Sequence, residues 1–221
     1  MLTTTYLLMA LTAAAVAGEG VDLFPRQLPN GELPGWKWFC EEPECPIGAV
    51  WSLEDGVLQC KGTPRGYLYT EKDYTDFILE LEWRWPKDRP GNGGVLLRTT
   101  APHKIWPRCL EAQINADNAG DFWTIGGYRV TGEHPRRKTV EHAVFGTLVN
   151  LVKAEHAEKP AGEWNHYRIV VQGDTVTLWV NGKQVNRATG CEVLPGKICL
   201  TAEGDAIAFR NVRLIPLDKA E

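Results

Sequence analysis

The chain has 221 residues, of which 43% are hydrophobic and 24% are charged. These values are typical of a globular protein with a sizeable core. The formal net charge of −4 gives no reason to expect nucleic acid or an anionic membrane surface as a partner. Nine tryptophans are many for this length. Most are expected in the core, and any exposed ones are suited to stacking on sugar rings.

The N-terminus has the pattern of a signal peptide. An apolar run from Tyr6 to Ala17 ends in Ala15-Val16-Ala17, the small-x-small pattern of a cleavage site. The run is too short to span a bilayer, so no membrane span is expected. The sequence therefore predicts a signal peptide at residues 1–17, export to the periplasm or secretion, and a single domain over residues 18–221.

An even number of cysteines in an exported chain suggests disulfides. The local pairs Cys40–Cys45 and Cys191–Cys199 are the simplest choice, and they leave Cys60 to pair with Cys109. This connectivity is one of 15 possible for six cysteines. Because neither a CxxC pair nor a zinc-like Cys/His spacing is present, structural disulfides are favoured over redox or zinc chemistry.

Strand patterns dominate after residue 49. Residues 49–60, "AVWSLEDGVLQC", are typical of two short strands around an Asp55-Gly56 hairpin turn. Residues 76–85, "DFILELEWRW", alternate strictly between apolar and mostly polar side chains, which predicts a strand with one face in the core.

The later segments extend this pattern. Strands are expected over 93–100, three over 164–189 with turns at Gly173-Asp174 and Asn181-Gly182, and two over 196–217. Residues 115–160 are interpreted as a long irregular insertion, a common place for a functional site. Many strands with tight turns and no long helical period predict an all-β fold, a jelly-roll sandwich of two antiparallel sheets.

The stretch after Cys109 carries the most informative polar pair. On a strand, Glu111 and Gln113 point to one face while Leu110, Ala112 and Ile114 point to the other. A core on one side and an acid–amide pair on the other predict a sheet face that handles a polar ligand. Trp106 and Trp123, which border this stretch, suit either binding or catalysis on that face.

If neighbouring strands align, their polar faces form one cluster. Its members are Glu80, Glu82, Arg84, Arg98, Glu111 and Gln113. The alternative is that the first three are solvated residues of an outer sheet face, and that Arg98 is a simple ion-pair partner. His134 and His142, in the insertion, are candidate bases or proton donors, or else ordinary loop residues.

Conventional sugar hydrolysis needs two carboxylates that flank the scissile bond. Jelly-roll glucanases of the laminarinase and lichenase type place theirs on one strand as ExDxxE. The same frame in this chain contains Glu111, Gln113 and Ala116, so two of the three carboxylates are missing. Direct displacement at the anomeric carbon is therefore poorly supported.

The chain resembles the 3-keto-disaccharide hydrolase domain family, which shares a concanavalin-like jelly-roll fold with those glucanases. The resemblance runs from about residue 33 to 217 and rests on the order and spacing of several stretches. These are "LPGW", "WSLEDGVLQC", "YLYTEKDYTDFILELEWRW", "NGGVLLR", "LEAQI", "KPAGEWNHYRIVVQGDTVTLWVNGKQV" and "GKICLTAEGDAIAFRNVRLIPL". The usual Asn-Ser-Gly turn of the family is Asn92-Gly93-Gly94 here, and residues 117–158 match the family poorly.

The resemblance implies an elimination that needs only one base. A ketone at C3 of a glycoside acidifies the C2 hydrogen, so a base can remove it and the aglycone can leave C1. As a hypothesis, Glu111 is the base, Arg98 stabilises the oxygen on C3, and His134 or His142 protonates the leaving group. Gln113 orients the sugar. The sugar-binding candidates are Gln113, Glu80, Glu82, Arg84, Asn92, Trp106 and Trp123.

Two other functions compete with this one. A non-catalytic carbohydrate-binding module would use the same face without a general base, and a laminin-G-like interaction domain would need a more neutral face. No metal site and no cofactor are predicted, although a divalent metal in place of Arg98 is left open. The expected partner is a small carbohydrate, and the chemistry implies an upstream glycoside 3-oxidoreductase.

Overall fold

The computed structural model describes residues 20–24 and 33–217, so the predicted signal peptide lies outside the described residues. It has one short helix, α1, at Ile47–Val50, and the rest of its regular structure is β-strand. Within the described ranges no helix is long and apolar enough to cross a membrane. The strands are β1 (Val21–Asp22), β2 (Trp36–Cys40), β3 (Trp51–Glu54), β4 (Val57–Cys60), β5 (Gly66–Thr70), β6 (Phe77–Arg84), β7 (Gly94–Thr100), β8 (Arg108–Gln113), β9 (Phe122–Ile125), β10 (Arg137–His142), β11 (Gly146–Leu151), β12 (Asn165–Gln172), β13 (Thr175–Val180), β14 (Lys183–Ala188), β15 (Lys197–Ala202) and β16 (Ile207–Pro216).

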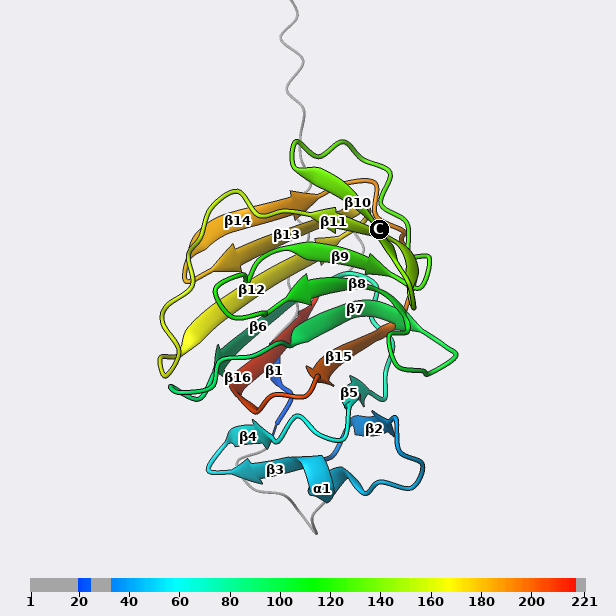
Figure 1. Cartoon of the computed structure of the whole chain (residues 1–221). Helices are drawn as coiled ribbons and strands as arrows, with labels where there is room; N and C mark the ends of the chain where they lie inside the picture. Colours follow the sequence, from blue (N-terminus) through cyan, green and yellow to red (C-terminus); the bar gives the residue numbers. More distant parts are fainter. Residues whose placement is uncertain (1–19, 25–32, 218–221) are drawn as a thin grey trace, which may run out of the picture.

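The strands form two antiparallel eight-stranded sheets that lie face to face (Figure 1). The first sheet has the order β14-β13-β12-β6-β16-β4-β3, with β1 paired to β16. The second has the order β10-β11-β9-β8-β7-β15-β5-β2 and is the front sheet in Figure 1. The predicted all-β jelly roll is confirmed.

Local turn chemistry explains the hairpins. Asp55 and Gly56 both have positive φ, +50° and +76°, between β3 and β4. Asn181 and Gly182 repeat this between β13 and β14 at +50° and +81°. Two left-handed residues in succession are what a type I′ turn requires, and Asn-Gly and Asp-Gly adopt them at low cost. Both predicted hairpins are confirmed.

The core fills the space between the two sheets. On β6, Phe77, Leu79, Leu81 and Trp83 are fully buried and point inward, as the alternation predicts. A second, smaller apolar cluster lies on the outer face of the second sheet, around Leu96 and its neighbours. The outer face of this sheet is therefore partly covered rather than fully solvated.

The insertion is more regular than the sequence predicts. Residues 115–160 contain β9, β10 and β11, which extend the second sheet at one edge. Strand β10 was missed because five of its six residues are exposed and four of them are charged or His, so it carries no apolar alternation. It is held by pairing with β11 instead of by burial.

The predicted disulfides are wrong: all six cysteines are described, and all six are free thiols. Cys60 and Cys191 belong to the core between the sheets, whereas Cys109 and Cys199 belong to the cluster on the outer face of the second sheet. A sheet therefore separates Cys60 from Cys109, and it also separates Cys191 from Cys199. Of the two predicted local pairs, only Cys40 and Cys45 are neighbours: Cys45 lies close enough to contribute to the raised pKa of Cys40, although both thiols are free.

Candidate active site

The predicted acid–amide face exists on β8 and is buried. Leu110, Ala112 and Ile114 are fully buried in the core between the sheets. Glu111 and Gln113 lie on the opposite face, yet only 6% and 8% of their surfaces are exposed. A carboxyl group this deeply buried costs free energy, so its position calls for a functional explanation.

The Glu111 carboxyl lies across the backbone of the neighbouring strand β7. A Cβ added at Gly94 would fall 2.2 Å from Glu111 Oε1, so this position must be glycine for the carboxyl to lie there. Among the described residues, no donor hydrogen-bonds to either carboxylate oxygen of Glu111. Burial, the larger effect, and the nearby charge of Glu203 both raise the pKa of Glu111 well above its usual value.

Glu203 is a second carboxyl that sequence reasoning missed. It follows β15, and its Oε2 accepts a hydrogen bond of 2.5 Å from Asn92 Nδ2. Asn92 Oδ1 in turn accepts one of 2.9 Å from Gln113 Nε2. Glu203 Oε1 is buried without a partner, and burial is the main reason that the pKa of Glu203 is also raised.

Two buried carboxyls that interact in this way do not both ionise at neutral pH. Each charge disfavours the other, and the surrounding protein disfavours both. The pair Glu111 and Glu203 therefore retains a proton into a pH range where ordinary glutamates have lost theirs. Such a pair can supply a base and a hydrogen-bond donor in the same place.

Glu111 lies in a cavity of about 280 Å³ on the outer face of the second sheet, which we call the cleft. Its polar lining residues are Asn92, Gln113, Asn115, Asn118 and Glu203. Its apolar and aromatic lining residues are Trp106, Trp123, Ile125, His142, Phe145 and Leu148. The cleft thus combines a few convergent polar groups with aromatic walls, as small-molecule sites commonly do.

His142 reaches the cleft from the end of β10. Its ring stacks on Phe145 with centroids 4.5 Å apart, and Phe145 meets Trp106 edge to face at 5.9 Å. His142 Nδ1 accepts hydrogen bonds from the backbone N–H groups of Val144 and Phe145 at 3.1 and 3.3 Å. The neutral ring therefore carries its proton on Nε2.

The family model of the 3-keto-alpha-glucoside-1,2-lyase-like domain matches residues 24–215. The chain belongs to this family. A search of curated proteins found no match. Together with its fold, membership of the 3-keto-alpha-glucoside-1,2-lyase-like family makes this a carbohydrate-active domain.

Solved structures confirm the fold of this family member. A protein from Parabacteroides distasonis, provisionally named a glycosyl hydrolase, is 22% identical with a TM-score of 0.62, and the match covers 90% of this chain and 94% of that one. The laminarinase from Rhodothermus marinus is 12% identical with a TM-score of 0.59, over 93% and 99% of the two chains. The carbohydrate-binding module CBM66 from Bacillus subtilis is 15% identical with a TM-score of 0.54, over 81% and 94%.

The predicted role of Arg98 is wrong. Arg98 is 1% exposed and has a φ of +49° within a bulge of the β7–β8 pairing, which removes its side chain from the cleft. Its guanidinium donates to the carbonyl oxygens of Thr75, Gly173 and Glu192 at 3.0, 2.7 and 2.6 Å, and to Asp76 Oδ1 at 3.1 Å. All these acceptors are protein groups, so Arg98 serves the fold and not the sugar.

The predicted contribution of β6 is also wrong, because β6 lies in the first sheet. Glu80 pairs with Arg168, and Glu82 accepts from Arg210 Nε at 2.6 Å. Arg84 lies 4.5 Å from the ring centre of Trp164, a cation–π contact. These residues belong to the alternative that the sequence left open, an outer sheet face.

A larger cavity of about 810 Å³ lies over that face and includes Glu80 and Glu82 in its lining. We do not place the active site there, because its two glutamates are each matched by an arginine. In the smaller cleft, neither Glu111 nor Glu203 forms an ion pair with a described Lys, Arg or His. The unpaired carboxyls of the cleft, and not the volume of the cavity, identify the site.

His134 lies outside the cleft as well. Its Nε2 is 2.9 Å from Asn186 Oδ1, and it lines a separate depression beside β14. Of the two predicted histidines, only His142 lies beside Glu111, together with the predicted Asn92, Trp106, Gln113 and Trp123. The described residues contain no group of three or more His, Cys, Asp or Glu side chains suited to a metal ion.

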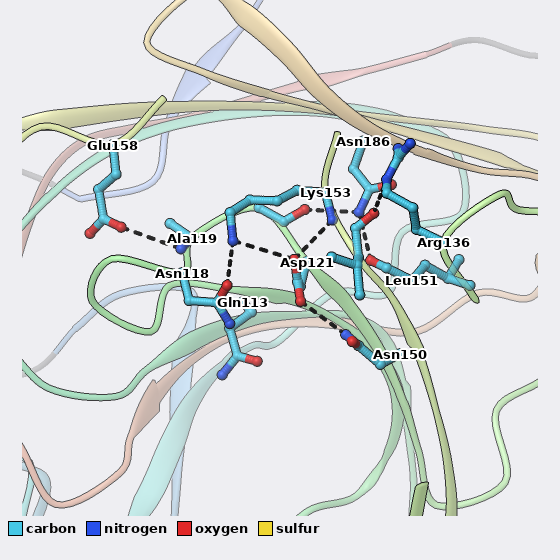
Figure 2. Close-up of polar contacts among 12 residues, drawn as sticks. Gln113, Asn118, Ala119, Asp121, Arg136, Asn150, Leu151, Lys153, Glu158 and Asn186 are labelled. Carbon is cyan, nitrogen blue, oxygen red and sulfur yellow. Dashed lines mark hydrogen bonds and ion pairs between the residues drawn. The ribbon is translucent and has the colours of Figure 1, made fainter. Parts of the chain in front are cut away.

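A buried polar network supports one edge of the cleft (Figure 2). Asp121 Oδ2 accepts from Asn150 Nδ2 at 3.1 Å, and Asp121 Oδ1 accepts from the backbone N–H of Lys153 at 2.9 Å. The Lys153 ammonium lies 3.6 Å from Asp121 Oδ1 and donates to Asn118 Oδ1. This network holds Asn118 at the mouth of the cleft.

Replacing Gly94 by Ala is expected to lower activity by about 10²-fold, because displacing a reacting group by about 1 Å costs this much. Gly93→Ala is the matched control: its Cβ would meet nothing closer than Trp85 Cη2 at 3.4 Å. Steady-state kinetics of both variants, with circular dichroism to verify the fold, make the test. Equal activities of the two variants would show that the position of the Glu111 carboxyl is unimportant.

Proposed function

We propose that this protein cleaves the glycosidic bond of 3-keto glycosides by elimination followed by hydration. The observation that carries the proposal is the uncompensated carboxyl of Glu111, with its raised pKa, at the centre of a cleft with polar and aromatic walls. A base whose pKa is raised toward neutrality is suited to removing a carbon-bound proton. Family membership supports the choice of substrate.

In the first step, Glu111 removes the proton from C2 of the bound sugar. The C2–H electron pair moves into a C2–C3 double bond, and the oxygen on C3 becomes an enolate. Each amide NH2 of Asn92 and Gln113 has two donors, of which one is used within the protein. The remaining donors take over the task that the sequence assigned to Arg98.

In the second step, the enolate reforms the ketone and the C1–C2 double bond forms. The bond from C1 to the leaving oxygen breaks with its electron pair. His142, with its proton on Nε2, donates to that oxygen. Addition of water, with OH at C1 and a proton at C2, then gives the free 3-keto sugar.

A conventional two-carboxylate hydrolysis fits the site less well. That mechanism needs carboxyls on both sides of the glycosidic bond, each with an oxygen free to reach it. Glu203 Oε1 is buried, and Oε2 is occupied by Asn92. Glu203 therefore tunes Glu111 instead of acting on the sugar.

The test is sugar release from a 3-keto disaccharide and from its unoxidised parent, with and without EDTA. We expect release from the keto form only, since the parent has no acidified C2 hydrogen. The measurement with EDTA tests whether the reaction requires a divalent metal, a possibility that the sequence left open. Binding of both sugars without release from either would instead favour the carbohydrate-binding module.

The upstream oxidoreductase and the export of the protein, both predicted from the sequence, are part of the same proposal. The substrate requires an oxidoreductase that converts a glycoside hydroxyl at C3 into the ketone. We propose that the protein meets this product after export through the predicted signal peptide at residues 1–17.

A further inference from the structure

The cleft is asymmetric along β8. At one end Gln113 pairs with Gly94, and Asn92 and Glu203 lie beside them. At the other end Cys109 pairs with Ile125 of β9. Glu111 lies between the two ends, where its partner across the sheet is Trp123. A substrate whose reacting carbon lies at Glu111 therefore extends toward a polar end on one side and a different environment on the other.

Apolar and aromatic groups line that second end. Trp106 precedes the first residue of β8, so it lies at the Cys109 end. Strand β11 pairs Val149 with Thr124, which brings the β10–β11 turn beside the end of β9. Phe145 of this turn meets Trp106 edge to face, with ring centres 5.9 Å apart and planes at 84°. The two half-buried rings form an apolar corner on the cleft.

Few polar groups are available at the aromatic end. Between Glu111 and this end, Trp123 Nε1 is buried without a partner among the described residues, out of reach of a ligand. The Nδ1 atom of His142 is occupied by backbone N–H groups, which leaves Nε2. A second sugar at this end would bring several hydroxyl groups to face Ile125 and Leu148, and unpaired hydroxyls cost free energy.

We propose that the leaving group held at this end is an aromatic aglycone and not a second sugar. The inference rests on the proposed function and adds the substrate class to it. The polar end holds the 3-keto sugar, and the corner of Trp106 and Phe145 holds the aryl ring, which gains from stacked and edge-to-face contacts. When the bond from C1 breaks, the phenolic oxygen takes the proton of His142.

The experiment compares two 3-keto glucosides, one with a phenyl aglycone and one with glucose as aglycone. Intrinsic leaving-group reactivity cancels when each variant is compared with the wild type on the same substrate. Because the Phe145 ring also stacks on His142, Phe145→Ala is expected to lower kcat/KM for both substrates, with a loss at least 10-fold greater for the phenyl substrate than for the disaccharide. Val144→Ala is the matched control, because Val144 is 77% exposed on the same turn and should change neither.

Phe145→Leu is a second variant, for the case that Phe145→Ala misfolds. It keeps apolar volume without the ring, so it should show the same selective loss. Equal losses on both substrates would overturn the inference while leaving the proposed function intact. If neither keto substrate is cleaved, the proposed function fails. Calorimetric titration of the unoxidised phenyl glucoside and of the unoxidised disaccharide then tests the inference separately. The inference is overturned if the phenyl glucoside binds no more tightly than the disaccharide, or if Phe145→Ala leaves its affinity unchanged.

Discussion

Glu111→Gln is expected to lower turnover of a 3-keto glycoside by about 10²–10⁴-fold, the usual contribution of a general base. The amide keeps the shape of the side chain but cannot accept the C2 proton. In the wild type, kcat/KM should fall as the pH drops through the raised pKa of Glu111, at a higher pH than an ordinary glutamate would give. Kinetics of wild type and variant between pH 4 and 8 check both expectations.

The same substitution is expected to stabilise the protein at neutral pH. Since the pKa of Glu111 is higher in the folded than in the unfolded state, the folded state binds more protons between the two values. The free energy of unfolding of the wild type therefore falls as the pH rises from about 4.5 through the folded-state pKa. Gln lacks this penalty, so the variant gains about 1–3 kcal/mol at pH 8 and little near pH 4.

Urea unfolding at several pH values measures this gain. Glu80→Gln is the control, since Glu80 is a partly exposed glutamate paired with Arg168 on the other sheet. Its effect should stay within about 1 kcal/mol at every pH. If the Glu111→Gln variant were less stable than the wild type at pH 8, the folded protein would have to stabilise the charged carboxylate, which would contradict the expected cost of its burial. Stability lost for function at a single residue is a common property of active sites.

Local features of the fold could be predicted from the sequence, because their causes are local. The Asp55-Gly56 and Asn181-Gly182 turns depend on φ preferences of the residues themselves. The alternation in β6 and β8 depends only on which side of a strand faces the core. From these patterns the strands, their buried and polar faces, and the Glu111–Gln113 pair could be predicted.

The assembly of the site could not be predicted, because it depends on which strands become neighbours. Nothing within 76–85 or 109–114 says that β6 and β8 belong to different sheets. Glu203 precedes Gly204 and Asp205, so it resembles a turn residue until β15 is placed beside β7. The sequence around each cysteine does not indicate which sheet the cysteine belongs to, or which face of that sheet it occupies.

Arg98 illustrates the same limit and leads to a prediction of its own. Arg98→Ala is expected to lower the free energy of unfolding by about 3–5 kcal/mol, because it leaves a buried set of acceptors without a donor. Its guanidinium now links Thr75 and Asp76, before β6, with Gly173 of the β12–β13 turn and Glu192. The bonds join segments far apart in sequence, so the whole sandwich should lose stability.

Arg98→Lys should recover only part of this loss, since one ammonium cannot donate in the planar directions that a guanidinium reaches. Urea midpoints of both variants at pH 7 provide the measurement. At temperatures where the variants remain folded, kcat is expected to stay near that of the wild type, because Arg98 does not face the cleft. A variant with a wild-type midpoint and no activity would place Arg98 at the substrate after all. The two measurements thus separate a structural arginine from a catalytic one.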